Sequence, residues 1–186
     1  PNIGEPPRTA PLPAELRSGV AIKVGDQITT DHIIATGSVS RYRSNIPKSS
    51  EFVFQRVDPL FVQRCKENGA REMASVIVAG LSYGQGSSRE HAALCPAYLG
   101  VRAVIAKSIE RIHAANLVNF GILPLAFTDP RDYENIEVGD ELFIADTRSA
   151  LNQPVITVKN RTRGLEFTVS HSLTPRQIAI IQASGA

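Results

Sequence analysis

Short apolar runs alternate with segments of helical spacing through the middle of the chain. Residues 74–79 (ASVIVA) form an almost wholly apolar run, which is typical of a strand buried on both faces of a sheet. A glycine-rich turn follows at 80–86, and helical spacing then runs from Ser88 to about Leu99, where Gly100 ends it. The pattern then repeats and predicts a strand, a helix and a strand, at 102–106, 108–119 and 122–126. This order and spacing are typical of parallel βαβ units.

The N-terminal third is patterned less clearly. Residues 1–17 hold five prolines and no apolar period, which predicts an extended linker. An apolar run at 20–24 (VAIKV) predicts a strand. Residues 29–50 show almost no hydrophobic period and predict a loop, and a loop of that length is usually functional or disordered. Residues 51–69 return to helical spacing. Three of them are expected on a common face: Leu60, Phe61 and Cys65.

The last third predicts hairpins or a meander. Short runs broken by turn residues predict three strands, at 140–144, 154–158 and 165–169. A closing helix is expected at Thr174, because Thr174 can cap it, Pro175 suits the first helical position and Gln177 can complete a capping box. The expected fold is one α/β domain with a mixed sheet, over residues 18–186, after the linker.

Composition narrows the function classes. A chain of 186 residues matches the size of one domain, and a formal net charge of +2 is too balanced for a nucleic-acid-binding surface. No apolar run approaches the roughly 20 residues of a membrane span, and the Pro-rich start is not a signal peptide. We therefore expect a cytoplasmic protein without a membrane partner. Two cysteines, Cys65 and Cys95, are too few for an iron–sulfur or zinc site, so no metal site is expected on this chain.

The strongest candidate for chemistry is the segment at 83–91 (YGQGSSREH), between a predicted strand and a predicted helix. Ser87 and Glu90 have the spacing of a capping box. A helix N-terminus favours an anion, and Arg89 in the first turn is unfavourable there unless a carboxylate or phosphate neutralises it. The segment lacks the third glycine of a dinucleotide fingerprint and the lysine of a P-loop, which favours a small anion. In the alternative, the serines only cap the helix and Arg89 pairs with a surface acid.

A second cluster lies in the expected loop. Asp31 and His32 are adjacent and suit acid–base chemistry, although Asp31 can also cap a turn. Arg41 and Arg43 follow, and such arginines are usually solvated. Arginines on a flexible loop can also hold a polycarboxylate with paired hydrogen bonds.

Four stretches carry a resemblance in this order: TDHI at 30–33, GQGSSREHAAL at 84–94, AKSIERIH at 106–113 and NFGILPL at 119–125. Together they resemble the C-terminal swivel domain of the aconitase family, which includes homoaconitase and the small subunit of isopropylmalate isomerase. The resemblance runs from about residue 20 to about residue 180. It implies a swivelling β/β/α domain that closes over an active site, whose [4Fe–4S] cluster is carried by other domains or by a partner chain.

The resemblance also implies roles for six residues. Three are expected to be catalytic, with Ser87 as the base and the others in a supporting motif: Ser87, Asp31 and His32. Three are expected to bind substrate carboxylates: Arg43, Ser88 and Arg89. Arg41 is the alternative to Arg43, because the loop around it differs from that of aconitase.

The reaction implied by the resemblance is that of a hydro-lyase of the tricarboxylic acid cycle. Citrate and isocitrate would interconvert through cis-aconitate by dehydration and rehydration, with a tricarboxylate as substrate. The partner would be the cluster-bearing aconitase domains, in the same polypeptide or in a large subunit, and this chain alone is expected to be inactive. Alternatives are a separate small subunit of isopropylmalate isomerase or homoaconitase, and a non-catalytic module that binds RNA or another anion. The balanced charge and the few aromatic residues argue against RNA binding.

Overall fold

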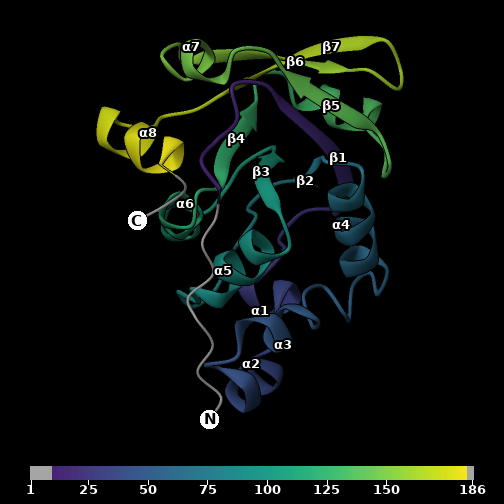
Figure 1. The fold of residues 1–186 in the computed structure, drawn as a ribbon, viewed down its shortest axis with the longest axis vertical. Coiled ribbons are helices and arrows are strands. Elements are labelled where there is room, and N and C mark those ends of the chain that lie inside the picture. Colours follow the sequence, from purple (N-terminus) through teal and green to yellow (C-terminus); the bar gives the residue numbers. More distant parts are fainter. Residues whose placement is uncertain (1–9, 184–186) are drawn as a thin grey trace.

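The structure is a computed structural model that describes residues 10–183. Residues 1–9, which make up much of the predicted linker, lie outside the described part, as do residues 184–186. The described strands close into one barrel in the order β1-β2-β3-β4-β7-β6-β5 (Figure 1). Their bounds are β1 (Leu16–Lys23), β2 (Ala74–Ala79), β3 (Val101–Ala106), β4 (Leu123–Phe127), β5 (Glu141–Ile144), β6 (Val155–Asn160) and β7 (Leu165–Ser170).

The parallel half of the barrel contains the βαβ units that the sequence predicts. β1 to β4 pair in parallel, and Ile105 of β3 lies between Val78 of β2 and Leu125 of β4. α5 (His91–Tyr98) connects β2 to β3, and α6 (Arg111–Asn119) connects β3 to β4. The prediction of parallel strands with helical connections is therefore confirmed.

The antiparallel half confirms the predicted hairpins and closes the barrel. β5 pairs with β6 and β6 with β7, while β5 also pairs with β1 and β7 with β4. Buried and exposed residues alternate along β6, as expected for a strand with one face in the barrel. α7 (Thr147–Leu151) and the 3-10 helix η1 (Pro130–Asn135) lie in the connections. α8 (Pro175–Gln182) begins as predicted, with a capping box between Thr174 and Gln177.

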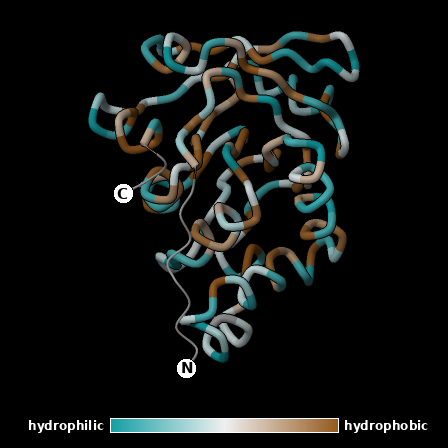
Figure 2. The backbone as a smooth tube through the Cα atoms, in the orientation of Figure 1, coloured by the Kyte–Doolittle hydropathy of each residue, from teal (hydrophilic) through white to brown (hydrophobic). Residues whose placement is uncertain are grey.

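Apolar side chains form two cores, one on each face of the parallel strands. Along β2, Val76 and Val78 join the core inside the barrel, whereas Ile77 and Ala79 join the core under the helices. In Figure 1, β5 to β7 lie on one side of these strands, and α5 lies on the other with α4 (Phe61–Ala70). Figure 2 shows hydrophobic segments gathered along the inner strands and the inward helix faces. This layering matches a β/β/α order, and the swivelling motion stays a prediction.

The N-terminal boundary differs from the prediction. β1 begins at Leu16, so the predicted end of the linker falls inside a strand. Upstream of it, Leu12 is buried in the barrel core, and Arg102 donates from Nη1 to the Ala10 carbonyl at 2.8 Å. The described end of the Pro-rich stretch therefore packs on the domain, through one buried leucine and through hydrogen bonds to its backbone.

The loop expected at 29–50 is also corrected. It contains three short helices: α1 (Thr30–Ile33), α2 (Thr36–Tyr42) and α3 (Ile46–Ser50). Thr29 caps α1 and Asn45 caps α3 through their side chains. Helices of one or two turns bury too few residues to produce a periodic pattern, and this is why the sequence suggested a loop.

The helix expected at 51–69 begins later than predicted. α4 begins at Phe61, after Pro59 and a left-handed residue at Phe54 (φ 55°). Phe61 and Cys65 are buried as expected, but Leu60 is 53% exposed because it precedes the helix and faces solvent.

Candidate active site

The predicted serines lie on residues 80–90 between β2 and α5, the pinned segment, whose backbone is held at several points. The N–H groups of Gly84 and Gln85 both donate to the Ile28 carbonyl, at 2.7 and 3.2 Å. The Thr30 N–H donates to the Gln85 carbonyl at 2.9 Å, and the Thr30 hydroxyl donates to the Ser87 carbonyl at 3.2 Å. The segment is therefore held against the residues that lead into α1.

This pinning delays the start of the following helix. α5 begins at His91, so the predicted helix start at Ser88 is wrong, and so is the capping box of Ser87 with Glu90. Glu90 precedes the helix and makes no side-chain capping hydrogen bond. Arg89 is consequently outside the first turn. Backbone groups that already bond to another segment are not free to begin a helix, although the local spacing favours one.

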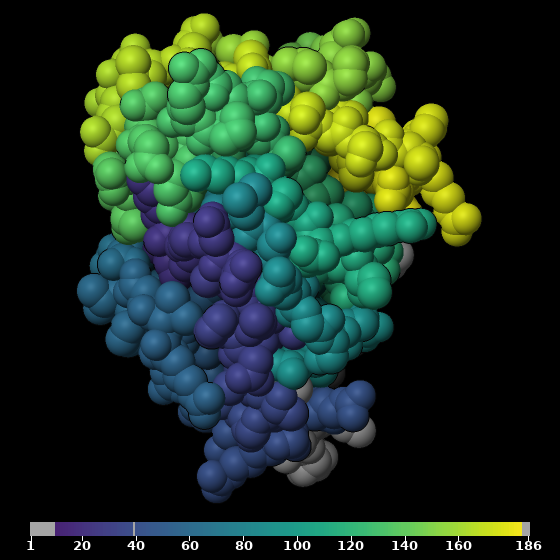
Figure 3. All heavy atoms as spheres, turned by 180° about the vertical axis from the view of Figure 1, so that it is seen from behind, coloured from purple at the N-terminus to yellow at the C-terminus, as the bar shows by residue number. Residues whose placement is uncertain are grey.

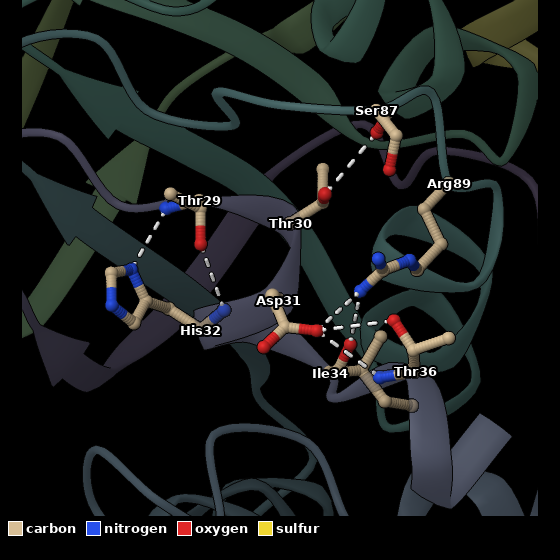
Figure 4. Close-up of polar contacts among 8 residues, drawn as sticks. All are labelled: Thr29, Thr30, Asp31, His32, Ile34, Thr36, Ser87 and Arg89. Carbon is tan, nitrogen blue, oxygen red and sulfur yellow. Dashed lines mark hydrogen bonds and ion pairs between the residues drawn. The ribbon is translucent and has the colours of Figure 1, made fainter.

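Arg89 is instead bound to the chain around α1 (Figure 4). Its Nη1 lies 3.1 Å from Asp31 Oδ1 and donates to the Ile34 carbonyl at 2.8 Å. Asp31 Oδ1 also accepts from the N–H and the hydroxyl of Thr36, both at 3.2 Å. The Thr36 N–H, followed by the Arg89 guanidinium, lowers the pKa of Asp31. The alternative prediction had two parts. The pairing of Arg89 with a surface acid is confirmed, but the prediction that the serines cap the helix is wrong.

Asp31 and His32 do not form the acid–base pair that their adjacency suggests. The His32 Nδ1 accepts from the Thr29 N–H at 3.0 Å, and the His32 N–H donates to Thr29 Oγ1 at 3.1 Å, which makes a capping box for α1. Figure 4 shows the His32 ring on the opposite side of α1 from Ser87 and Arg89. Because the ring caps a helix away from these residues, the structure does not bring His32 into the candidate site.

A pocket of about 440 Å³ opens beside the Arg89 network. Seven described residues line it: Thr36, Ser40, Arg43, Ser88, Arg89, Glu90 and His91. The structure thus brings together Arg43, Ser88 and Arg89, the three predicted carboxylate ligands, although α2 and the pinned segment lie far apart in sequence. Ser87 is exposed beside Ser88 but does not line the pocket, and neither does Arg41. The segment of α1 to α3 forms one end of the molecule, seen as the dark-blue lobe in Figure 3.

His91 ties the two sides of the pocket together. Its Nε2 lies 2.9 Å from the Arg43 carbonyl oxygen, so the neutral or charged ring can donate to that oxygen. The contact joins the first residue of α5 to the residue that ends α2. The position of the Arg43 backbone is therefore set by the same element that follows Ser88 and Arg89.

Beneath the pinned segment lie two buried aromatic side chains with unpaired polar atoms. The rings of Tyr83 and His113 lie edge to face, and their centroids are 5.3 Å apart. Neither the Tyr83 hydroxyl nor either His113 ring nitrogen has a hydrogen-bond partner within the described residues. Burial lowers the pKa of His113 to about 4, so the ring is neutral near pH 7.

The buried ring of His113 predicts an acid-sensitive fold. An unfolded histidine titrates near pH 6.5, so between about pH 6.5 and pH 4 the unfolded chain binds a proton that the folded chain excludes, and stability falls as the pH falls. We expect His113 to contribute about 2–3 kcal/mol to the loss of unfolding free energy between pH 7 and pH 4.5. Urea unfolding at both pH values checks this, with His113→Leu expected to show a smaller pH dependence by that amount. An unchanged pH dependence in the variant would contradict the assignment.

The chain's own donors do not fit an iron–sulfur cluster. Within residues 10–183, no group of three or more histidine, cysteine or acidic side chains is placed to hold a metal. Cys65 and Cys95 are buried free thiols on different helices, and burial raises the pKa of each to about 11. Metal ligation requires thiolates, which these environments disfavour.

Several residues at the site were not predicted from the sequence. Thr36 and Ser40 line the pocket from α2, the helix hidden in the segment predicted to be a loop. Asn116 on α6 donates from Nδ2 to Ser88 Oγ at 3.3 Å. The available signal for Asn116 was an amide within the inward face of a predicted helix, where it is only 9% exposed.

None of the helices within residues 10–183 is long and apolar enough to cross a membrane. The cytoplasmic location expected from composition stays a prediction.

Comparison with known proteins places these features in a family. Residues 47–130 match the family model described as the aconitase C-terminal domain. The chain is 35% identical to a probable mitochondrial aconitate hydratase of Caenorhabditis elegans over 90% of its own length, but it spans only 24% of that relative. It is 41% identical to the 3-isopropylmalate dehydratase small subunit 2 of Archaeoglobus fulgidus, covering 81% of each chain.

A solved structure shows the same fold. The crystal structure of 3-isopropylmalate dehydratase from Methanocaldococcus jannaschii matches with a TM-score of 0.68 and 26% identity, over 93% of this chain and 90% of that one. The small-subunit relative is covered over most of its length, and the resemblance carried by the Gly-Ser-Ser-Arg-Glu-His block agrees with it. The chain belongs to the aconitase C-terminal domain family.

Proposed function

We propose that this chain supplies the carboxylate-binding part of the active site of an aconitase-type hydro-lyase. The observation that carries the proposal is the pocket in which Arg43, Ser88 and Arg89 converge. Arginine binds carboxylates with paired, charge-assisted hydrogen bonds. The volume of the pocket, about 440 Å³, lies in the usual range for small-molecule sites.

The lining of the pocket favours a tricarboxylate as the substrate. All of its described lining residues carry polar or charged side chains. A branched alkyl group placed there would desolvate those groups without replacing their hydrogen bonds, which costs free energy. A third carboxylate would accept hydrogen bonds from the donors among these groups, which are hydroxyls, guanidinium groups and an imidazole, whereas Glu90 offers only acceptor oxygens. The proposed reaction is therefore the interconversion of citrate and isocitrate through cis-aconitate.

In this proposal the Ser87 alkoxide takes the proton from the carbon next to a carboxylate as hydroxide leaves the neighbouring carbon. In rehydration hydroxide adds to the alkene at the other carbon, and the Ser87 hydroxyl returns a proton to the carbon beside it. A serine hydroxyl is a weak base unless its alkoxide is stabilised. The late start of α5 removes the helix N-terminus that the sequence suggested as a source of stabilisation, and the N–H groups of Gly84 and Gln85 already bond to the Ile28 carbonyl. The guanidinium of Arg89 is a further source of positive charge, which it shares with the carboxylate of Asp31, and a nearby positive charge favours the ionised form. A [4Fe–4S] cluster is proposed on other domains or on a partner chain, since the donors of this chain do not fit one.

A second candidate function has one specific observation in its favour. The chain is 41% identical to the A. fulgidus 3-isopropylmalate dehydratase small subunit, and 34–35% identical to two of the aconitate hydratases. The higher identity favours the role of a small subunit, which would pair with a large, cluster-bearing subunit. In that case the substrate would be 3-isopropylmalate.

A ligand titration distinguishes the two functions. We expect citrate to perturb the side-chain NMR signals of Arg43 and Arg89 at lower concentration than 3-isopropylmalate does. Tighter binding of 3-isopropylmalate would favour the second candidate. No perturbation at either arginine by isocitrate, homocitrate, citrate or 3-isopropylmalate would contradict both.

The same titration tests which loop arginine contacts the substrate. Arg43→Lys keeps the charge but removes the planar guanidinium, so we expect citrate affinity to fall about tenfold. Arg41→Lys is the matched control, because Arg41 lies in the last turn of α2, two residues before Arg43, stacks on Tyr42 and does not line the pocket. The citrate affinity of the Arg41→Lys variant is expected to stay within about twofold of that of the parent. The reverse order would assign the role to Arg41.

A further inference from the structure

The hydroxyl of Ser88 is oriented by a side chain that reaches it from another element. Asn116 projects from α6 and donates from Nδ2 to Ser88 Oγ at 3.3 Å. The bonds from Thr30 reach the backbone of this segment, at Gln85 and Ser87, and the side chain of Arg89 is held separately by Asp31 and the Ile34 carbonyl. Asn116 is therefore the contact that acts on the Ser88 hydroxyl.

α6 contacts the pinned segment at two points. His113 packs under Gly84, and Asn116, one turn further along the same buried face, reaches Ser88. Both side chains are buried, with 2% and 9% of their surface exposed. Ser88, in contrast, is exposed and lines the pocket. The Asn116 amide therefore approaches from the protein interior, whereas Ser88 lies at the exposed pocket.

The direction of this hydrogen bond decides what Ser88 can do. A hydroxyl has one hydrogen to donate and two lone pairs that accept. When the Asn116 amide occupies a lone pair, the Ser88 hydrogen stays available for a carboxylate in the pocket. With an acceptor in place of the amide, Ser88 would donate inward, and its lone pairs would face the carboxylate.

We propose that Asn116 is a positioning residue that fixes the Ser88 hydroxyl as a hydrogen-bond donor to a substrate carboxylate. The inference rests on the proposed function, because it assigns that carboxylate to the same pocket. It predicts that Asn116 acts on substrate binding only through Ser88.

A double-mutant cycle on the complete enzyme, this chain with its cluster-bearing domains, tests the inference with citrate as substrate. We expect Asn116→Leu and Ser88→Ala each to raise KM about tenfold, with kcat within about threefold of the parent. The double variant is expected to raise KM by the same tenfold, since the two residues act as one unit. A roughly hundredfold rise in the double variant, or no rise in Asn116→Leu, would overturn the proposal.

A second variant tests the direction of the bond and does not depend on filling the same space with an apolar side chain. Asn116→Asp keeps the shape but replaces the donor with an acceptor, so KM is expected to rise at least as far as in Asn116→Leu. Asn119, exposed at the end of the same helix, provides the matched controls Asn119→Leu and Asn119→Asp, which should leave KM within about twofold. A purely structural role would lower the folded fraction and apparent kcat with KM unchanged, which would overturn the proposal.

The outcomes separate this inference from the function on which it rests. A parent enzyme that does not turn over citrate would contradict the tricarboxylate function and remove the inference with it. A parent enzyme that turns over citrate, combined with additive effects of Asn116→Leu and Ser88→Ala, would leave the function standing and overturn the inference alone.

Discussion

Replacing Gly84 with alanine is expected to lower the free energy of unfolding by about 3–5 kcal/mol. Gly84 has a φ of 89°, a region that strains a residue with a side chain. A Cβ at this position would lie 2.4–2.5 Å from three side-chain atoms of His113. His113 is buried against Tyr83, so its ring has little room to move away. Backbone strain and steric overlap therefore add in this variant.

Gly100→Ala separates those two effects. Gly100 has nearly the same φ, 91°, but a Cβ there would meet no heavy atom within 4 Å. Its substitution is expected to cost only the backbone part, about 1–2 kcal/mol. Urea unfolding of both variants measures the difference, and His113→Ala in the Gly84→Ala background should recover part of the loss. Equal losses in the two glycine variants would contradict a steric role for His113.

The elements that the sequence predicted well are those whose signal is local and repeated. The runs at 74–79 and 102–106 are buried on both faces, so nearly every residue in them is apolar. The barrel closure has no such signal. It depends on the antiparallel pairing of β1 with β5 and of β4 with β7, between segments far apart in the chain. The local sequence of a strand does not indicate which distant strand it pairs with.

Two segments have the spacing of a capping box, and the box forms in only one of them. Thr174 and Gln177 form the predicted box at the start of α8, with both of its reciprocal hydrogen bonds present. Ser87 and Glu90 have the same spacing, but the Ser87 carbonyl is bound by the Thr30 hydroxyl. A tertiary contact thus overrides a local preference that is worth about 1 kcal/mol.

The candidate site was predictable where a motif carried it and not where packing builds it. The resemblance placed Arg43, Ser88 and Arg89 in one role, and the structure brings them to one pocket. Asp31 was found as well, but as a partner of Arg89 and not of its neighbour His32. That preference follows from α1, which points adjacent side chains in different directions. Adjacency in sequence was therefore a poor guide to contact.

Ser87→Ala is expected to lower kcat of the complete enzyme about 10³-fold while KM for citrate stays within about threefold. The variant removes the proposed proton acceptor but keeps the backbone contact, because Thr30 binds the carbonyl of Ser87 and not its hydroxyl. The fold and the pocket should therefore be unchanged, since Ser87 is exposed and does not line the pocket. Ser88→Ala is the neighbouring control and should mainly raise KM. Steady-state kinetics of the two variants, made from the same preparation of cluster-bearing domains, checks this contrast. A kcat within about tenfold of the parent in Ser87→Ala would show that another group takes the proton.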